Sequence, residues 1–172
     1  SGNAYFICED FDVDIFIPSV NLGKALHEDL VRVYVYQRKR SKKLEADVVE
    51  IVERAKQEFV GTLQMSKNFG FVIPDNPRIP VDIFIAKSKI NDAEHGDKVL
   101  AKLTDWPDNS KNPFGKITQV LGKPGDHDTE IHSILLEYGL PYEFPEHIEQ
   151  EASKLPIEIT KEEISKRRNM RA

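Results

Sequence analysis

The sequence is poor in the residues that would indicate export or a membrane. Its 172 residues include one cysteine, Cys8, so no disulfide can form within the chain and a reducing compartment is expected. The longest apolar stretches, such as SILLEYGL (133–140), are far shorter than the ~20 residues that cross a bilayer. No charged-then-apolar leader opens the sequence. We therefore expect a cytoplasmic protein without a membrane partner.

Signals of catalysis are also scarce. The sequence has no closely spaced carboxylate cluster suited to two metal ions, no phosphate-binding glycine loop and no nucleophile elbow. His127 and His132 are five residues apart, whereas a spacing of four would put two ligands on one helix face. The four carboxylates of EDFDVD (9–14) fall between predicted strands, where a solvated turn is expected. We expect this stretch of chain to be catalytically silent and to need no cofactor of its own.

An excess of negative charge, a net −5, at first argues against a nucleic-acid partner. The tail from Asp126 onward accounts for all of it, with eleven acidic and six basic residues. Residues 1–125 hold eighteen of each sign, and within them RVYVYQRKRSKK (32–43) has six basic residues and no acidic one. The overall charge therefore hides a local basic segment that could contact phosphates.

An internal repeat organises the first 125 residues. DIFIPS (14–19) returns as DIFIAK (82–87), and ALHEDLVRV (25–33) returns as AEHGDKVLA (93–101), both 68 positions later. AYFI (4–7) and ADVVEIV (46–52) likewise match GFVI and GKITQVL at nearly the same spacing. Four matched blocks in one order indicate two copies of a small domain.

Each copy is predicted to consist of short β-strands. In VRVYVY (31–36) the valines alternate with Arg32, Tyr34 and Tyr36, the period of a strand with one buried face. His27 and His95 precede turn acids and are interpreted as turn or packing residues. In the second copy the alternation places Phe69 and Phe71 on one face, around a glycine that permits close backbone approach.

Phe84 of the neighbouring DIF segment is expected on that same face. Lys67 lies two residues before Phe69, so a strand position would put it on the same face as well. Aromatic rings rimmed by cations are what single-stranded nucleic acid requires of a sheet. The alternative is that one or two of these rings fill the core.

KNFGFVIPD followed by VDIFIAKSKINDAEHGDKV resembles the cold-shock domain, with its K-x-F-G-F strand and its following F-containing strand. The resemblance implies an OB-fold barrel that binds single-stranded RNA or DNA, with Lys67, Phe69, Phe71 and Phe84 as binding residues. The family usually has histidine after the second motif, where this sequence has Ala86. One stacking ring is therefore missing.

The first copy departs further from the pattern. It keeps Tyr5 and has Phe16 where the second copy has Phe84, and both are candidate binding residues. Its basic loop could add phosphate contacts that give affinity without specificity; the alternative is a solvated loop. The candidate phosphate-binding residues of this loop are Arg38, Lys39, Arg40, Lys42 and Lys43.

We predict a mostly β chain with two tandem five-stranded OB barrels and a short helical connector. The predicted boundaries are 1–57, 58–125 and 126–172. EFVGTLQMS (58–66) has no counterpart in the first copy, so the first barrel is expected to lack its initial strand. The exposed edges would invite strand exchange, and an oligomer of this stretch would then be an artefact of truncation.

The tail sharpens the functional prediction. Ile131, Ile134, Leu135 and Tyr138 are spaced as one helical face, which we expect to pack on a neighbouring domain. TKEE (160–163) has the form of a capping box at the start of a second, charged helix. GLPYEFP and a terminal R-R-x-x-R stretch after two cold-shock-like domains resemble the ribonuclease II/R family.

This resemblance implies the RNA-binding region of a 3′-to-5′ exoribonuclease. Single-stranded RNA and the chain's own C-terminal catalytic domain are the implied partners, and magnesium is expected only in that absent domain. Two alternatives remain open: a stand-alone RNA chaperone without a nuclease, and a protein-interaction module whose aromatic residues are buried against a partner.

Overall fold

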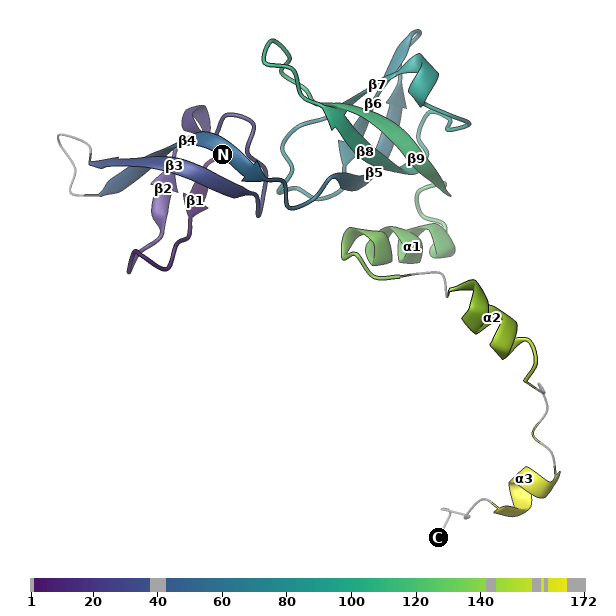
Figure 1. Ribbon diagram of the computed structural model, residues 1–172. Coiled ribbons are helices and arrows are strands. Elements are labelled where there is room, and N and C mark those ends of the chain that lie inside the picture. Colours follow the sequence, from purple (N-terminus) through teal and green to yellow (C-terminus); the bar gives the residue numbers. More distant parts are fainter. Residues whose placement is uncertain (1, 38–42, 142–144, 156–158, 160, 167–172) are drawn as a thin grey trace.

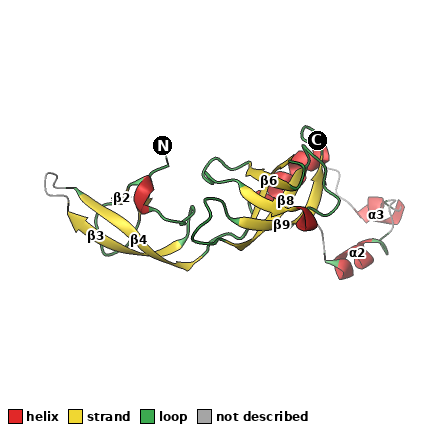
Figure 2. Ribbon diagram, turned by 90° about the horizontal axis from the view of Figure 1, so that it is seen from above, coloured by secondary structure: helices red, strands yellow, loops and turns green. Residues whose placement is uncertain are grey.

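The computed structural model describes residues 2–37, 43–141, 145–155, 159 and 161–166. Two β units lie side by side, and the α-helices of the described residues follow the second unit (Figures 1 and 2). Among the described residues, no helix is long and apolar enough to cross a membrane.

The second unit is a closed five-stranded barrel in the order β5-β6-β7-β9-β8. Its strands are β5 (Glu58–Met65), β6 (Phe69–Pro74), β7 (Ile83–Ala86), β8 (Lys98–Asp105) and β9 (Phe114–Gly122). Alternation along each strand sends one set of side chains inward. The buried core includes Phe59, Leu63, Val72, Ile83 and Ile85.

The first unit is a four-stranded sheet in the order β1-β2-β4-β3. Its strands are β1 (Ala4–Phe6), β2 (Ile15–Ile17), β3 (Leu30–Gln37) and β4 (Leu44–Glu53). The order repeats β6-β7-β9-β8 of the barrel, and within the described residues nothing corresponds to β5. The predicted fold class is therefore confirmed: the chain is mostly β, with one closed barrel and a second sheet. The core of this sheet is built on Ile15, Ile17 and Ala46.

The repeat extends to one polar turn in each unit. Asp29 accepts hydrogen bonds from the Leu26 N–H (2.7 Å) and from the Arg54 guanidinium (2.6 Å). In the barrel, Asp97 accepts one from the Glu94 N–H (2.8 Å) and pairs with Lys123 at 2.6 Å. Each carboxylate thus ties the turn before one strand to the end of the next strand of its unit.

In the barrel, the charged groups of this turn shift each other's pKa. Burial by itself would raise the pKa of Asp97, but the hydrogen bonds from Lys123 and from the Glu94 backbone outweigh burial and lower that pKa below its ordinary value. The hydrogen bonds that the Lys123 ammonium donates, first to the Asp97 carboxylate and then to the Glu94 carboxylate, raise the pKa of Lys123. His95 accepts a hydrogen bond from the Met65 N–H at 3.0 Å, a packing role in this turn.

The loop between β8 and β9 bridges the two units. The Lys24 ammonium donates to the Trp106 carbonyl at 2.5 Å and pairs with Asp108 at 2.5 Å. The Arg54 guanidinium lies 5.8 Å from the centre of the Trp106 ring, within cation–π range. The contact therefore joins the end of the first sheet to the barrel.

Helix α1 (His127–Glu137) packs against the barrel mainly through small residues. Its buried residues are Thr129 and Ser133, whereas Ile131, Ile134 and Tyr138 are exposed. Thr129 is small, so the helix can lie close to β9. The Thr129 hydroxyl donates a hydrogen bond to the Leu121 carbonyl at 3.2 Å. The apolar stripe is thus largely free of the barrel, and its packing on a neighbouring domain stays a prediction.

The end of α1 follows the sequence closely. Gly139 takes a positive φ of 65°, and its N–H donates to the Leu136 carbonyl at 3.1 Å. The Leu140 N–H donates to the Leu135 carbonyl at 2.8 Å, which completes a Schellman motif. Helices α2 (Glu146–Ala152) and α3 (Lys161–Lys166) continue away from the barrel (Figure 1). Thr160 of the expected capping box lies outside the described residues.

Candidate nucleic-acid interface

Three phenylalanines gather on the outside of the barrel. Phe69 and Phe71 project from β6 and Phe84 from β7, with ring centroids 5.6 Å apart for Phe69–Phe71 and for Phe69–Phe84, and 5.8 Å for Phe71–Phe84. All three are partly exposed, while their strand neighbours Val72 and Ile83 are buried. The predicted shared face exists, and the alternative that the rings fill the core is wrong.

A fourth ring belongs to the same group. Phe114 on β9 is the parallel partner of Phe84, and their centroids are 5.2 Å apart. It is 37% exposed, so its ring is open to solvent. We call Phe69, Phe71, Phe84 and Phe114 the phenylalanine cluster; Phe84 contacts the other three. Phe114 stands just before the repeated block GKITQVL, and that position was the available sequence signal.

Glycines keep the backbone beneath the cluster close to the core. A Cβ at Gly70 would lie 2.9 Å from Leu63 Cδ1, and one at Gly115 would lie 2.6 Å from Ile83 Cγ2 and 2.9 Å from the Lys102 carbonyl oxygen. The close approach expected at Gly70 is therefore present. The rings stand outside because the inner side has no room even for a methyl group.

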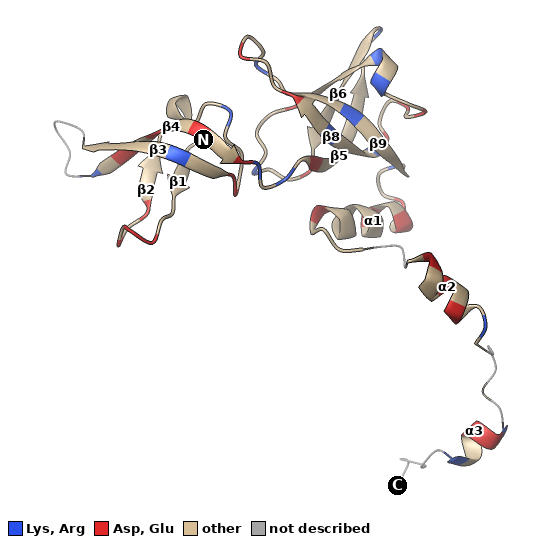
Figure 3. Ribbon diagram, viewed as in Figure 1, with Lys and Arg blue, Asp and Glu red and all other residues tan. Residues whose placement is uncertain are grey.

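Lysines follow the cluster's strands closely in the chain. Lys87 and Lys89 lie in the short 3-10 helix that follows β7, and Lys116 lies two residues after Phe114 on β9; Figure 3 shows basic residues at both places. Lys67 is exposed but lies in the turn between β5 and β6, where the Ser66 N–H donates to the Phe69 carbonyl at 2.8 Å. The expectation of a strand position for Lys67 was wrong, because the hairpin turn interrupts the alternation.

Ala86 pairs directly with Phe69 at the end of β7. The histidine that the resemblance implies at this position is replaced by alanine, so no ring stands opposite Phe69 on β7, as the sequence indicated. Phe114 extends the cluster in the other direction, across β7. The four rings therefore run over β6, β7 and β9.

The first sheet has a smaller aromatic group. Tyr5 on β1 pairs with Phe16 on β2, as Phe71 pairs with Phe84, and the two rings meet edge to face at 5.7 Å. Tyr5 is 64% exposed. Lys43 is exposed just before β4. The other four candidates of the basic loop lie outside the described residues: Arg38, Lys39, Arg40 and Lys42.

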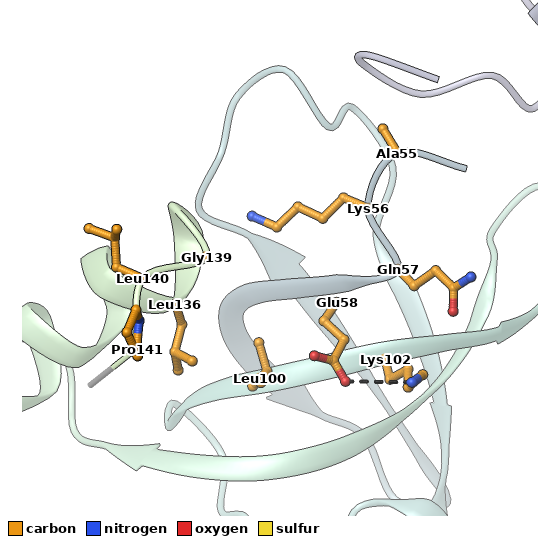
Figure 4. Close-up of a pocket in the computed structure, with 10 residues that line it drawn as sticks. All are labelled: Ala55, Lys56, Gln57, Glu58, Leu100, Lys102, Leu136, Gly139, Leu140 and Pro141. Atoms are coloured by element: carbon orange, nitrogen blue, oxygen red, sulfur yellow. Dashed lines mark ion pairs between the residues drawn. The ribbon is translucent and has the colours of Figure 1, made fainter. Parts of the chain in front are cut away.

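A groove of about 600 Å³ opens elsewhere, between the end of α1 and strands β5 and β8 (Figure 4). Leu100, Leu136 and Leu140 provide its apolar walls, and Glu58 pairs with Lys102 at its rim at 3.8 Å. None of the phenylalanine cluster lines it. Across the described residues, no group of three or more His, Cys, Asp or Glu side chains is placed to hold a metal ion.

Comparisons with known proteins agree with this architecture. Residues 1–51 match the Ribonuclease B OB domain, and residues 71–145 match the Cold shock domain. The two matched domain models therefore lie in tandem along the chain. The domain boundaries at 57/58 and 125/126 stay predictions.

Over nearly its whole length the chain is similar to ribonuclease R, which confirms the predicted resemblance. It is 32% identical to ribonuclease R of Thermotoga maritima over 98% of this chain and 24% of that protein. It is 30% identical to that of Aquifex aeolicus over 92% of this chain and 22% of that protein. The chain thus spans about a quarter of the length of these curated relatives.

Two solved structures share the fold. Mycoplasma genitalium RNase R in complex with ribose-methylated single-stranded RNA superposes with a TM-score of 0.77 at 23% identity, over 91% of this chain and 25% of that one. Yeast Ssd1, a pseudonuclease, superposes with a TM-score of 0.73 at 22% identity, over 97% of this chain and 27% of that one. The same arrangement of domains therefore occurs in a nuclease and in a pseudonuclease.

Proposed function

We propose that this chain is the single-stranded RNA-binding region of a cytoplasmic 3′-to-5′ exoribonuclease, and that it guides RNA into a catalytic domain. The phenylalanine cluster carries the proposal. Four partly exposed rings lie within 6 Å of a neighbour on the outside of a barrel, with lysines beside them. Bases stack on such rings for about 1–3 kcal/mol each, whatever their sequence.

The electrostatics of the same surface support an RNA strand. Lys87 and Lys89 border one side of the cluster and Lys116 the other, so phosphates on either side of a stacked base would meet a cation. Such contacts add affinity that falls as salt rises. The Tyr5–Phe16 pair would form a weaker counterpart on the first sheet.

The relatives support the enzymatic part of the proposal. Those named ribonuclease R match this chain over almost all of its residues, and a ribonuclease R of the same fold has been solved with single-stranded RNA. Hydrolysis and the expected magnesium would belong to a catalytic domain outside this sequence. Because Ssd1 shares the fold, an exonuclease assay on the full-length protein is what tests that part.

The RNA-binding part can be tested with labelled single-stranded RNA by fluorescence anisotropy at two salt concentrations. The double variant Phe69→Ala/Phe71→Ala should bind at least ten-fold more weakly, because it removes two stacking rings. Tyr138→Ala is the control, since it removes an exposed ring from α1, outside the cluster. Circular dichroism would check that both variants are folded.

Equal binding by a folded double variant would overturn the assignment of the cluster. Binding that does not weaken with salt would favour the alternative of a protein-interaction module. Binding by a full-length protein without exonuclease activity would favour the RNA chaperone.

A further inference from the structure

A pair of stacked rings, separate from Tyr5 and Phe16, lies on the outer face of the first sheet. Tyr34 and Tyr36 follow each other on one face of β3, with centroids 6.3 Å apart and planes within 22° of parallel. Tyr34 is 64% exposed. The pair lies on a different strand from Tyr5 and Phe16, so it is a separate aromatic group.

A polar network holds Tyr36 in place. The Asn21 amide donates to the Tyr36 hydroxyl at 3.1 Å and also to Asp47, and the Tyr36 hydroxyl donates to Glu45 at 3.5 Å. Burial, followed by the charge of Asp47, raises the pKa of Tyr36, so its hydroxyl keeps its proton. A ring fixed in this way loses little freedom when a ligand stacks on it.

Two carboxylates lie between the aromatic pairs. Glu45 is the register partner of Phe16 on one side and of Tyr36 on the other, and Asp47 is the partner of Tyr34. Adjacent strands are about 4.8 Å apart, so the row from β1 to β3 is roughly 14 Å long. That length accommodates two or three bases of an extended strand.

The same positions in the barrel have different chemistry. Where Phe16 faces Glu45, Phe84 faces Phe114. The strand pair β8–β9 places Lys102 opposite Lys116, at the positions of Tyr34 and Asp47 in the first sheet. Two lysines in the barrel are thus replaced by a tyrosine and a carboxylate.

This replacement changes what can bind. Carboxylates repel phosphate, so an RNA backbone would not lie directly on Asp47 and Glu45. They accept hydrogen bonds from base amino groups, as Asp and Glu do from the N4 amino group of cytosine. Single-stranded bases are read by stacking on aromatic rings together with hydrogen bonds to their edges. The face therefore fits bases that point towards the sheet, with phosphates directed away.

We propose that the outer face formed by Tyr34, Tyr36, Glu45 and Asp47 is a base-reading site that prefers bases carrying an amino group, such as cytosine, over uracil. Uracil presents a carbonyl oxygen where cytosine presents its amino group, and a carboxylate repels it. The inference rests on the proposed RNA-binding function and divides it between two surfaces. The barrel binds any base, and the first sheet selects among bases.

The test compares labelled oligocytidylate and oligouridylate of about eight nucleotides, within the range that one OB fold covers. The unmodified protein should bind oligocytidylate about ten-fold more tightly than oligouridylate, which is the discrimination expected of one good base-edge contact. Glu45→Gln/Asp47→Asn, which keeps side-chain shape and removes the charge, should abolish the preference without weakening oligouridylate binding. Tyr34→Ala, at an exposed position, should weaken oligocytidylate more than oligouridylate.

The outcomes separate this inference from the proposed function. If RNA binds and depends on the phenylalanine cluster but the Glu45/Asp47 variant keeps the base preference, the base-reading site is wrong and the RNA-binding region stands. If neither oligonucleotide binds, both are overturned. If a labelled arginine-rich peptide binds in place of RNA and the same variant loses it, the face is a protein-docking surface and the inference is likewise overturned.

Discussion

The first sheet and the barrel share their inner structure and differ on their outer face. Both have the same order of four strands, and both use a carboxylate–cation pair to tie one turn to a strand end. Outside, the barrel presents four phenylalanines and lysines, whereas the first sheet presents tyrosines and carboxylates. Packing constrains the inside of a repeated domain, because both copies must close the same core. The outer face is free to diverge, and it is there that the proposed RNA contacts of the two copies differ.

The largest expected effect concerns the core-facing side of the two units. Gly115 in the barrel occupies the position of Ala46 in the first sheet, yet a Cβ there would meet Ile83 and the Lys102 carbonyl at under 3 Å. Gly115→Val should lower the free energy of unfolding by about 3 kcal/mol, through overpacking. Ala46→Gly should cost only about 1 kcal/mol, from backbone freedom. Urea unfolding followed by circular dichroism measures both. Equal effects would mean that the two cores are packed alike.

The outer face offers the next largest effect. Phe84 touches all three other rings of the cluster, whereas its counterpart Phe16 touches only Tyr5 among the rings described. Phe84→Ala should weaken RNA binding by about 2 kcal/mol, within the range for one stacked base, and Phe16→Ala by less than half of that. Anisotropy titrations of the two variants give the comparison directly. A larger loss with Phe16→Ala would make the first sheet the main platform.

The repeated turn gives the smallest effect, and it depends on pH. The folded-state pKa of Asp97 lies below its unfolded value, so its stabilisation is complete above the unfolded pKa of about 3.9 and is lost as pH falls through the folded pKa. Because Lys123 is 62% exposed, the contribution is discounted to about 1 kcal/mol. Asp97→Asn should be less stable than the wild type at pH 7, and the gap should close below pH ~4.

Denaturation midpoints at several pH values give the measurement for Asp97. Glu94→Gln provides a matched control, because Glu94 is an exposed carboxylate that also pairs with Lys123. A gap between Asp97→Asn and the wild type that stays constant down to pH ~3 would contradict the role given to the Asp97 carboxylate.

Local alternation predicted much of the fold and part of the interface. The repeat predicted corresponding strands, and the two-residue period placed Phe69 and Phe71 together on the outside. Phe114 was missed because its contact with Phe84 depends on a parallel pairing of strands about 30 residues apart, which no local pattern reports. Lys67 was misplaced because a tight turn interrupts the period at that point.

The side of α1 that faces the barrel was not predicted, for a different reason. Hydrophobic spacing favours Ile131, Ile134 and Tyr138 as the packed side, but close approach to a strand favours small residues. A Cβ at Gly122 would lie 2.3 Å from the Thr129 hydroxyl oxygen, so the Thr129 side chain lies directly against the backbone at the end of β9. Thr129 and Ser133 fit that space, and the larger apolar residues do not.

The bridge between the units has a practical consequence. Trp106 is the chain's single tryptophan, and it lies at the contact with Lys24 and Arg54 of the first unit. A guanidinium at 5.8 Å and a neighbouring ammonium shape the electric field around its indole ring. The intrinsic tryptophan fluorescence of the chain is therefore a label-free reporter of the contact between its two β units. A ligand that separates the units would shift the emission maximum of Trp106.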